Sequence, residues 1–533
     1  MGNYVPRLTP HVTRPTSLVS RLTPHATRHP SLVTRHSSHV SPLTFYFLLF
    51  TLLLTSCTSP LPPRTPAPTL PSPTASPLPS SPTPSPTPTL TPTPAPLPRP
   101  QYSLNLALNY TRKAAAVEET ILYPNATGET LPNLVLAVEP NLWMGGFSLQ
   151  SLSVDETPVN AYTLKGQRLE IIMPQPLAPG NTTKLSLTFS LILPQMPAYS
   201  DPNDVRPQIY GYTSRQVNLV DWYPFVVPYI PGTGWILHNP WFYGEHLVYD
   251  AADFEVTVSF TDGSNPVIAA SGAEVPSGTD ASHKFVLEAA RTFALSFSTL
   301  YKVQSETVDG VTVYSYYFPF YESAGETVLH VTSQALQAYA AHFGSYPYAT
   351  MTAVQGDFND GMEFSGFYFL SRDFYNLYDG TPKNYLTIIA AHETAHQWWF
   401  DLVADDQALE PWLDEALATY SERVYYEQTT PDLVPWWWNY RVDFYQPSGF
   451  LDTRIYDAGG YRLYTNAVYL NGARFLEALR QRLGDEAFFA FLQDYVAQYA
   501  HRRATAADFF ALLRQHTTAD VSDIIGEYFK SMH

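Results

Sequence analysis

The chain of 533 residues has little cysteine, little charge and no long apolar run near its start. Its one cysteine, Cys57, excludes an intrachain disulfide and a zinc cage built from cysteines. Any metal site must therefore use histidine and carboxylate side chains. Charged residues make up only 15% of the chain, and the net charge of −18 argues against nucleic acid, which selects basic surfaces. The hydrophobic content of 45% is ample for a core.

The apolar run Phe45–Leu54 is too short to cross a bilayer as a helix, which needs about 20 residues. Its length and the arginines upstream predict a signal peptide over residues 44–57. The segment ends in "LTSC", which resembles a bacterial lipobox. We therefore expect a lipidated Cys57 that anchors the protein to an extracytoplasmic membrane surface. The alternative is an ordinary secretory signal and a secreted protein.

Two low-complexity segments flank this signal. Residues 1–43 repeat "RLTPH" at 7–11 and 21–25 and have little to bury, which predicts an unstructured segment. Alternatively, the translation start has been placed too early and this segment is spurious. Residues 58–100 are almost entirely proline, threonine and serine with leucine and alanine, a composition typical of an extended tether.

The remaining chain changes its hydrophobic period once. Runs such as "KLSLTFSL" and "DFEVTVSF" alternate with period two and are separated by turn residues, which predicts an antiparallel β domain over 101–305. From about residue 325 the spacing is helical, as in "VLHVTSQALQAYAAHF" and "GARFLEALRQRLG", with a helix stop at Gly484 and a start at Asp485. The predicted fold class is α+β, with a mainly α-helical domain over 306–533.

The segment "IIAAHETAHQWWF" places three ionisable side chains in an apolar helix. His392 and His396 are four residues apart, so both imidazoles face one side and can bind one metal ion. Glu393 is rotated by about 100° and can flank a metal-bound water. Burying these groups without a partner would be costly, and a metal relieves that cost. Because a pentapeptide of this kind also arises by chance, a third ligand is needed.

Glu415 is the candidate third ligand. It follows His396 by nineteen residues, in a second predicted helix, "PWLDEALATYSE". The intervening loop could fold that helix back on the first. Two histidines, one glutamate and one open position are typical of catalytic zinc. The alternative for Glu415 is a solvated helix glutamate without a role.

These motifs resemble the membrane alanyl aminopeptidase family of gluzincin metallopeptidases. "HETAHQWWFDLV" is similar to the family's HELAHQWFGNLV and "WLDEALATY" to its WLNEGFASY, and the resemblance extends over about 355–480. It implies a thermolysin-like zinc peptidase domain after the β domain, peptide substrates and a zinc cofactor. It also implies that Glu393 takes a proton from water and returns it to the leaving amine.

A further motif, "DGMEFSG" at 360–366, resembles the family's GAMEN. The resemblance implies that Gly361, Met362 and Glu363 contact the substrate and that Glu363 binds its free α-amine. Phe364 replaces the family's asparagine, and we expect it to place an aromatic ring next to the substrate cleft. The alternative for Glu363 is a glutamate at a strand end with no role.

"VYLNGARFL" resembles the family's Y-x-K-G-A, with Asn471 in place of the usual lysine. The resemblance implies that the Tyr469 hydroxyl stabilises the oxyanion, although Tyr461 and Tyr464 are near enough to compete. Asp401 and Asp414 could orient the zinc ligands or could serve only at helix ends.

The implied function is a zinc aminopeptidase that releases one N-terminal residue per cycle. Two alternatives stay open from the residues alone. One is a zinc endopeptidase on the same scaffold, in which Glu363 is only structural. The other is a tethered peptide-binding protein without turnover, which the presence of Glu393 makes less attractive.

Overall fold

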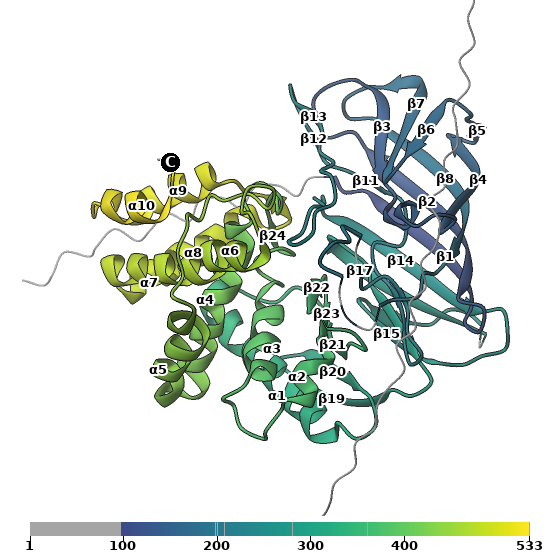
Figure 1. Cartoon of the computed structure of the whole chain (residues 1–533). Helices are drawn as coiled ribbons and strands as arrows, with labels where there is room; N and C mark the ends of the chain where they lie inside the picture. The colour runs from purple at the N-terminus through teal and green to yellow at the C-terminus, as the bar shows by residue number, and fades with distance from the viewer. Residues whose placement is uncertain are drawn as a thin grey trace, which may run out of the picture. The chain divides into compact units, whose positions relative to one another are not determined.

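The structure is a computed structural model that describes residues 98–531, apart from 198, 200, 207, 280 and 360. These residues belong to one compact unit of the chain (Figure 1). The predictions for 1–43, for 44–57 with Cys57, and for nearly all of 58–100 lie outside the described residues and stay predictions. Within the described part, none of the helices combines the length and the apolar character of a membrane span.

The first half of the described chain is built from strands in four sheets. The largest sheet has the order β16-β17-β14-β1-β2-β8-β4-β5, and the smaller ones are β15-β18-β10-β9, β11-β3-β7-β6 and β12-β13. The strands are β1 (Gln101–Asn109), β2 (Ala114–Pro124), β3 (Leu131–Ala137), β4 (Phe147–Val154), β5 (Thr157–Pro158), β6 (Tyr162–Lys165), β7 (Arg168–Leu177), β8 (Thr182–Ile192), β9 (Gly211–Tyr212), β10 (Val217–Leu219), β11 (Phe225–Val226), β12 (Tyr229–Ile230), β13 (Gly234–Trp235), β14 (Ala252–Phe260), β15 (Val267–Ala270), β16 (Ala273–Val275), β17 (Ser282–Ala290) and β18 (Leu295–Ser298).

The period-two pattern explains why these segments are strands. On β8, Leu185, Leu187, Phe189 and Leu191 are all buried while their neighbours are partly exposed, so one face of the sheet forms the core. One pair departs from the antiparallel expectation, because β1 runs parallel to β14. Parallel neighbours need a long connection, and the many strands between β1 and β14 in the chain provide one.

The second half combines a five-stranded sheet with helices, and in Figure 1 the helices gather away from the large β sheet. Its strands are β19 (Lys302–Val308), β20 (Val311–Tyr317), β21 (Thr350–Gln355), β22 (Met362–Phe364) and β23 (Phe367–Leu370), with a small pair β24 (Val403–Ala404) and β25 (Arg502–Arg503). The helices are α1 (Glu322–Phe343), α2 (Arg372–Asn376), α3 (Tyr385–Ala395), α4 (Trp412–Thr429), α5 (Val434–Trp437), α6 (Tyr461–Thr465), α7 (Asn471–Leu483), α8 (Asp485–Tyr499), α9 (Ala506–His516) and α10 (Ser522–Tyr528). The predicted boundary at 305 falls inside β19, which pairs with β20 and so goes with the second half.

Small residues let the helices around α3 and α4 approach closely. Ala390, Ala391 and Ala395 of α3 are fully buried, and α3 contacts both α1 and α4. A Cβ atom at Gly472 of α7 would lie only 2.3 Å from the Cβ atom of Ala416, so the approach of α7 to α4 requires glycine there. This approach also sets the position of Tyr469, which lies in the turn just before α7.

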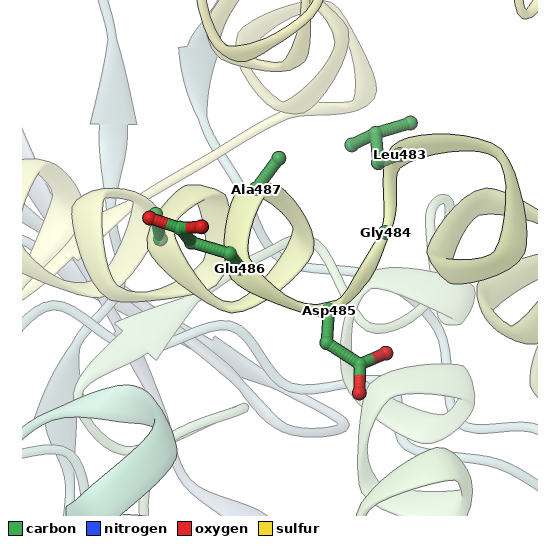
Figure 2. Close-up of a pocket in the computed structure, with 6 residues that line it drawn as sticks. Leu483, Gly484, Asp485, Glu486 and Ala487 are labelled. Carbon is green, nitrogen blue, oxygen red and sulfur yellow. The ribbon is translucent and has the colours of Figure 1, made fainter. Parts of the chain in front are cut away.

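The predicted helix stop at Gly484 is confirmed, because α7 ends at Leu483 and Gly484 has φ 81°. A surface hollow at this turn is lined by Leu483, Gly484, Asp485, Glu486, Ala487 and Ala490 (Figure 2). In Figure 2 the two carboxylates point in different directions, and that of Asp485 accepts hydrogen bonds from Arg480. The hollow therefore brings together no group of catalytic side chains.

Candidate metal centre

Helices α3 and α4 bring the three predicted ligands together. Nε2 of His392 lies 3.2 Å and Nε2 of His396 3.6 Å from Oε2 of Glu415. Ligands bound tetrahedrally to zinc at about 2.0–2.1 Å are themselves about 3.3 Å apart. His396 directly follows α3 and keeps helical dihedral angles, so its ring stays beside that of His392. The three ligand atoms, all within 4.8 Å of one another, therefore fit a zinc ion.

Polar contacts on the far side of each imidazole hold its orientation. Nδ1 of His396 lies 3.0 Å from the carbonyl oxygen of Trp399 and also contacts Oδ1 of Asp414. Nδ1 of His392 lies 2.9 Å from Oε1 of Glu422. Both rings thus direct Nε2 toward Glu415, as a metal site requires.

Glu422 was not predicted from the sequence. It lies two helical turns beyond Glu415 on α4, so that spacing was the one signal that could have identified it. Its carboxylate also accepts hydrogen bonds from Arg441, with Nε to Oε2 at 2.9 Å. Glu422 therefore links a predicted metal ligand to a buried cation.

Asp401 and Asp414, the two aspartates predicted to support the metal ligands or to serve at helix ends, make different contacts. Asp414 contacts His396, as one of its two predicted roles requires. The Asp401 backbone N–H donates to the carbonyl of His396, whereas its side chain lies near Ser365, Tyr348 and Arg291. Burial raises the pKa of Asp401 to about 6, although these three neighbours oppose the shift. Asp401 therefore supports the site through its backbone.

The charged groups of the metal cage, which consists of His392, His396 and Glu415, shift one another's pKa values. Burial lowers the pKa of His392, but Glu415 and Glu422 outweigh it and raise the pKa to about 9. Burial raises the pKa of Glu415, but His392 and His396 outweigh it and hold the pKa below its ordinary value. The carboxylate of Glu415 is therefore ionised inside the protein, ready to bind a cation.

Glu393 and Glu363 lie beside the cage. Both are buried, and their carboxylate oxygens lie with a nitrogen of His396 in a group whose atoms are all within 4.8 Å of one another. Glu393 lies on α3 and Glu363 on β22, the edge strand of the five-stranded sheet. A Cβ atom at Gly361 would lie 2.8 Å from Oε1 of Glu393, so a larger residue there would displace the Glu393 carboxylate.

Glu363 lies in an environment poor in positive charge. Burial raises the pKa of Glu363 well above its ordinary value; His396 opposes the shift, while Asp414 and Glu393 add to it. Nε2 of Gln407 lies 3.4 Å from Oε1 of Glu363 and donates more closely, at 2.7 Å, to Oδ2 of Asp414. A cationic ligand at this point would relieve the crowding of carboxylates.

A further carboxylate, Glu245, reaches the same region from the loop between β13 and β14. Burial raises the pKa of Glu245, and so do Glu415 and Glu363. Its Oε2 atom is buried without a hydrogen-bond partner among the described residues. No motif marks Glu245 in the sequence, because its position depends on how this loop lies against the second half of the described chain.

Of the three candidate tyrosines, Tyr469 lies at the cage. It belongs to a π-helical turn, η5 (Asn466–Leu470), and its hydroxyl donates to Oε1 of Glu415. Its ring also stacks on that of His392, with centroids 6.0 Å apart. Tyr464 is buried with no partner for its hydroxyl among the described residues, and Tyr461 is 60% exposed. The geometry thus favours Tyr469.

The expectation that Phe364 lies next to the substrate is wrong. Its side chain is buried and its ring centroid lies 6.2 Å from those of both Phe367 and Phe369. Neighbouring residues of a strand face opposite sides, so Glu363 faces the cage and Phe364 faces the core. Met362, on the same side as Phe364, is partly buried against this core.

Parts of the chain are similar in sequence to known proteins. Residues 327–528 match the family described as Peptidase family M1 domain. The chain is 27% identical over 248 residues to Aminopeptidase M1 of Arabidopsis thaliana, covering 43% of this chain and 28% of the relative. It is 24% identical over 306 residues to Aminopeptidase N of Lactobacillus helveticus, covering 52% and 36%. The chain thus spans about a third of the length of these relatives.

Among solved structures, the M1 zinc metallopeptidase from Deinococcus radiodurans is similar, with a TM-score of 0.58 and 18% identity. The match covers 82% of this chain and 95% of that one. It confirms the predicted fold class, a β domain followed by a helical region. The family whose model matches residues 327–528 is the one that the motifs resemble.

Proposed function

We propose that this chain, a member of the M1 family of zinc metallopeptidases through residues 327–528, removes the N-terminal residue from peptides. The observation that carries the proposal is the position of Glu363. Its buried carboxylate lies within 4.8 Å of the ligand atoms of Glu393 and His396, beside the metal cage. A group that binds the substrate's free amine there would place the first peptide bond at the cage.

The residues of this chain divide the chemistry among them. A zinc ion held by His392, His396 and Glu415 would supply Lewis-acid chemistry, which polarises a carbonyl and acidifies water. Glu393 accepts the proton of the attacking water and passes it to the leaving amine. Burial raises the pKa of Tyr469 well above its ordinary value, so its hydroxyl stays protonated and can donate to the oxyanion.

Selection for a free N-terminus follows from burial. Glu363 and Glu245 both have raised pKa values because burial removes them from water. An ammonium group offsets that cost by forming charge-assisted hydrogen bonds with these carboxylates. A mid-chain amide offers no such charge, so it leaves the carboxylates uncompensated and binds poorly.

The test uses matched free and N-acetylated peptides. We expect cleavage only of the free peptides, and Glu363→Gln should lower kcat/KM for them by about a hundredfold, as loss of a buried charge pair does. Glu477→Gln is the control, because Glu477 bonds Tyr420 and lies outside the cage. Equal cleavage of acetylated peptides would establish the endopeptidase alternative.

A binding protein without turnover is the remaining alternative. The presence of Glu393 beside the cage favours an enzyme, because a protein that only binds peptides needs no general base. Zinc-loaded wild-type protein should cleave a broad panel of free-amine peptides, whereas Glu393→Gln should not. If the two proteins are equally inert, the binding alternative is supported.

We also propose that Cys57 is lipidated and holds the enzyme at an extracytoplasmic membrane surface through the tether 58–100. The lipobox-like "LTSC" and the proline-rich composition support this proposal. Metabolic labelling with a fatty acid should mark the wild-type protein and not Cys57→Ser. Release of both proteins into the medium would favour the secreted alternative.

A further inference from the structure

Helix α3, all of whose residues are described, leaves only two positions partly exposed. They are Tyr385 and Ile389; the remaining residues of α3 are buried. Tyr385, Ile389 and Glu393 follow one another at intervals of four, so they lie along one face of the helix. Tyr385 and Ile389 thus form a partly exposed stripe, here called the open stripe, which leads from the buried general base to the N-terminal end of α3.

An aromatic surface continues the stripe beyond Tyr385. We call it the aromatic platform, and it consists of Tyr385, Trp436, Tyr440, Phe444 and Tyr445. The Tyr385 ring lies 5.2 Å from that of Tyr440, which stacks on Trp436 at 5.0 Å. The hydroxyl groups of Tyr385 and Tyr445 are 2.8 Å apart, and the Phe444 ring lies 5.1 Å from that of Tyr445.

The platform exposes large apolar rings. Phe444 is 73% and Tyr440 39% exposed, although both lie within a cluster of aromatic contacts. Rings of this kind bind apolar side chains by excluding water from both partners. A gathered patch therefore indicates a binding surface rather than scattered surface residues.

We propose that the aromatic platform binds the substrate downstream of the scissile bond and favours peptides with an apolar or aromatic residue there. The inference rests on the proposed function, because that function fixes the direction of the peptide. The amine end is held near Glu363, and Glu393 gives its proton to the leaving amine. The leaving peptide therefore begins beside Glu393 and continues along the open stripe.

The helix geometry sets which substrate residue reaches the platform. Tyr385 precedes Glu393 by eight residues, a distance of about 12 Å along a helix. An extended peptide advances about 3.3 Å per residue, so about three or four residues bridge that distance. The third or fourth residue after the scissile bond should contact the platform.

The test is a series of alanine peptides in which one phenylalanine occupies each of the first five downstream positions in turn. We expect kcat/KM to rise about five- to tenfold when phenylalanine stands third or fourth, the gain from partial burial of such a side chain. In the double variant Tyr440→Ser with Phe444→Ser, this increase should disappear relative to the kcat/KM of an alanyl coumarylamide, which has no downstream residues.

Met144→Ser is the matched control, because Met144 is fully exposed on the β domain and outside the platform. It should keep the full dependence on phenylalanine position. A flat series on an active wild-type enzyme, or the same position dependence in the double variant, would overturn the inference and leave the proposed function intact.

A binding measurement separates the two proposals. Fluorescence anisotropy of the labelled peptides on zinc-loaded Glu393→Gln does not depend on turnover. Tighter binding of the third- and fourth-position peptides, lost in the triple variant that adds Tyr440→Ser and Phe444→Ser, supports the platform even if no peptide is cleaved. Equal binding of the whole series would overturn the inference.

Discussion

The β domain and the second half of the described chain bury glutamates to the same degree, with opposite effects on their pKa values. Glu119 of β2 is 1% exposed, and neither carboxylate oxygen has a hydrogen-bond partner among the described residues. Burial raises its pKa well above the ordinary value. Glu422 of α4 is fully buried too, yet Arg441 and His392 outweigh burial and lower its pKa.

This contrast shows that burial alone does not mark a functional carboxylate. Glu119 avoids its desolvation cost by staying protonated, whereas Glu415 and Glu422 stay charged because cationic partners surround them. A charged, partnered carboxylate can bind a metal or orient its ligand. A neutral and isolated one affects only how stable the β domain is.

Replacing Glu393, the general base of the second half, should have the largest effect of any change in either region. Glu393→Gln should lower kcat by about 10³-fold, because general base catalysis contributes a factor of about 10²–10⁴. The measurement is the hydrolysis of a free-amine fluorogenic substrate together with the zinc content. Zinc content should not change, and activity above a tenth of wild type would contradict the assigned role.

Tyr469 and Tyr464 provide a comparison within the site. Tyr469→Phe should lower kcat by about 10²–10³-fold, the loss expected for one oxyanion donor. Tyr464→Phe should change kcat less than about threefold, because the Tyr464 hydroxyl has no partner among the described residues. Steady-state kinetics on both variants test this, and the reverse order of effects would assign the donor to Tyr464.

Replacing Glu422, which contacts the metal ligand His392, tests whether a charged carboxylate with cationic partners strengthens metal binding. Glu422→Gln should weaken zinc binding by about 10–100-fold, because it loosens the orientation of His392. Competition with a chelator measures the affinity. Glu427→Gln on the same helix is the control, since Glu427 pairs with Arg423 and Arg480 and not with histidine. Equal affinities in the two variants would refute the role of Glu422.

The isolated carboxylate of the β domain should affect only stability. Glu119→Leu should raise the free energy of unfolding at pH 8 by about 1–2 kcal/mol, because it removes an unpaired buried polar group. The folded pKa of Glu119 is raised, so its stability contribution is fully present below the unfolded pKa of about 4.3 and is lost as pH rises through the folded pKa. The gain from Glu119→Leu should therefore shrink at pH 4.

Denaturant titrations at both pH values provide the measurement. Glu118→Leu is the matched control, because it places the same substitution at the exposed neighbouring position of β2. A gain from Glu119→Leu that is the same at pH 4 and pH 8 would show that the pKa of Glu119 is not raised in the folded protein.

The sequence predicted the parts of the site that depend on local spacing. His392, Glu393 and His396 fall within one helical segment, and α4 needed only to fold back for Glu415 to join them. The alternation of apolar residues likewise predicted β8 and β14, because each buries one face. In these cases the residues that determine the local structure lie close together in the sequence.

The sequence could not predict contacts that depend on distant segments. Glu245 reaches the site from a loop of the β domain, and nothing near it in the sequence indicates a neighbouring cage. The orientation of Phe364 depended on which face of β22 meets the core, and a strand of three residues has too little pattern to decide this. The position of Asp401 depended on Arg291, more than a hundred residues earlier.

The central claim is that one zinc ion binds between His392, His396 and Glu415. X-ray absorption at the zinc edge of the purified protein, with metal analysis, tests it most directly. We predict one zinc per chain with two imidazole ligands and a carboxylate, and loss of that signal in Glu415→Ala. Zinc that binds with the same ligand shell in Glu415→Ala, or a wild-type protein that retains no zinc, would contradict the account.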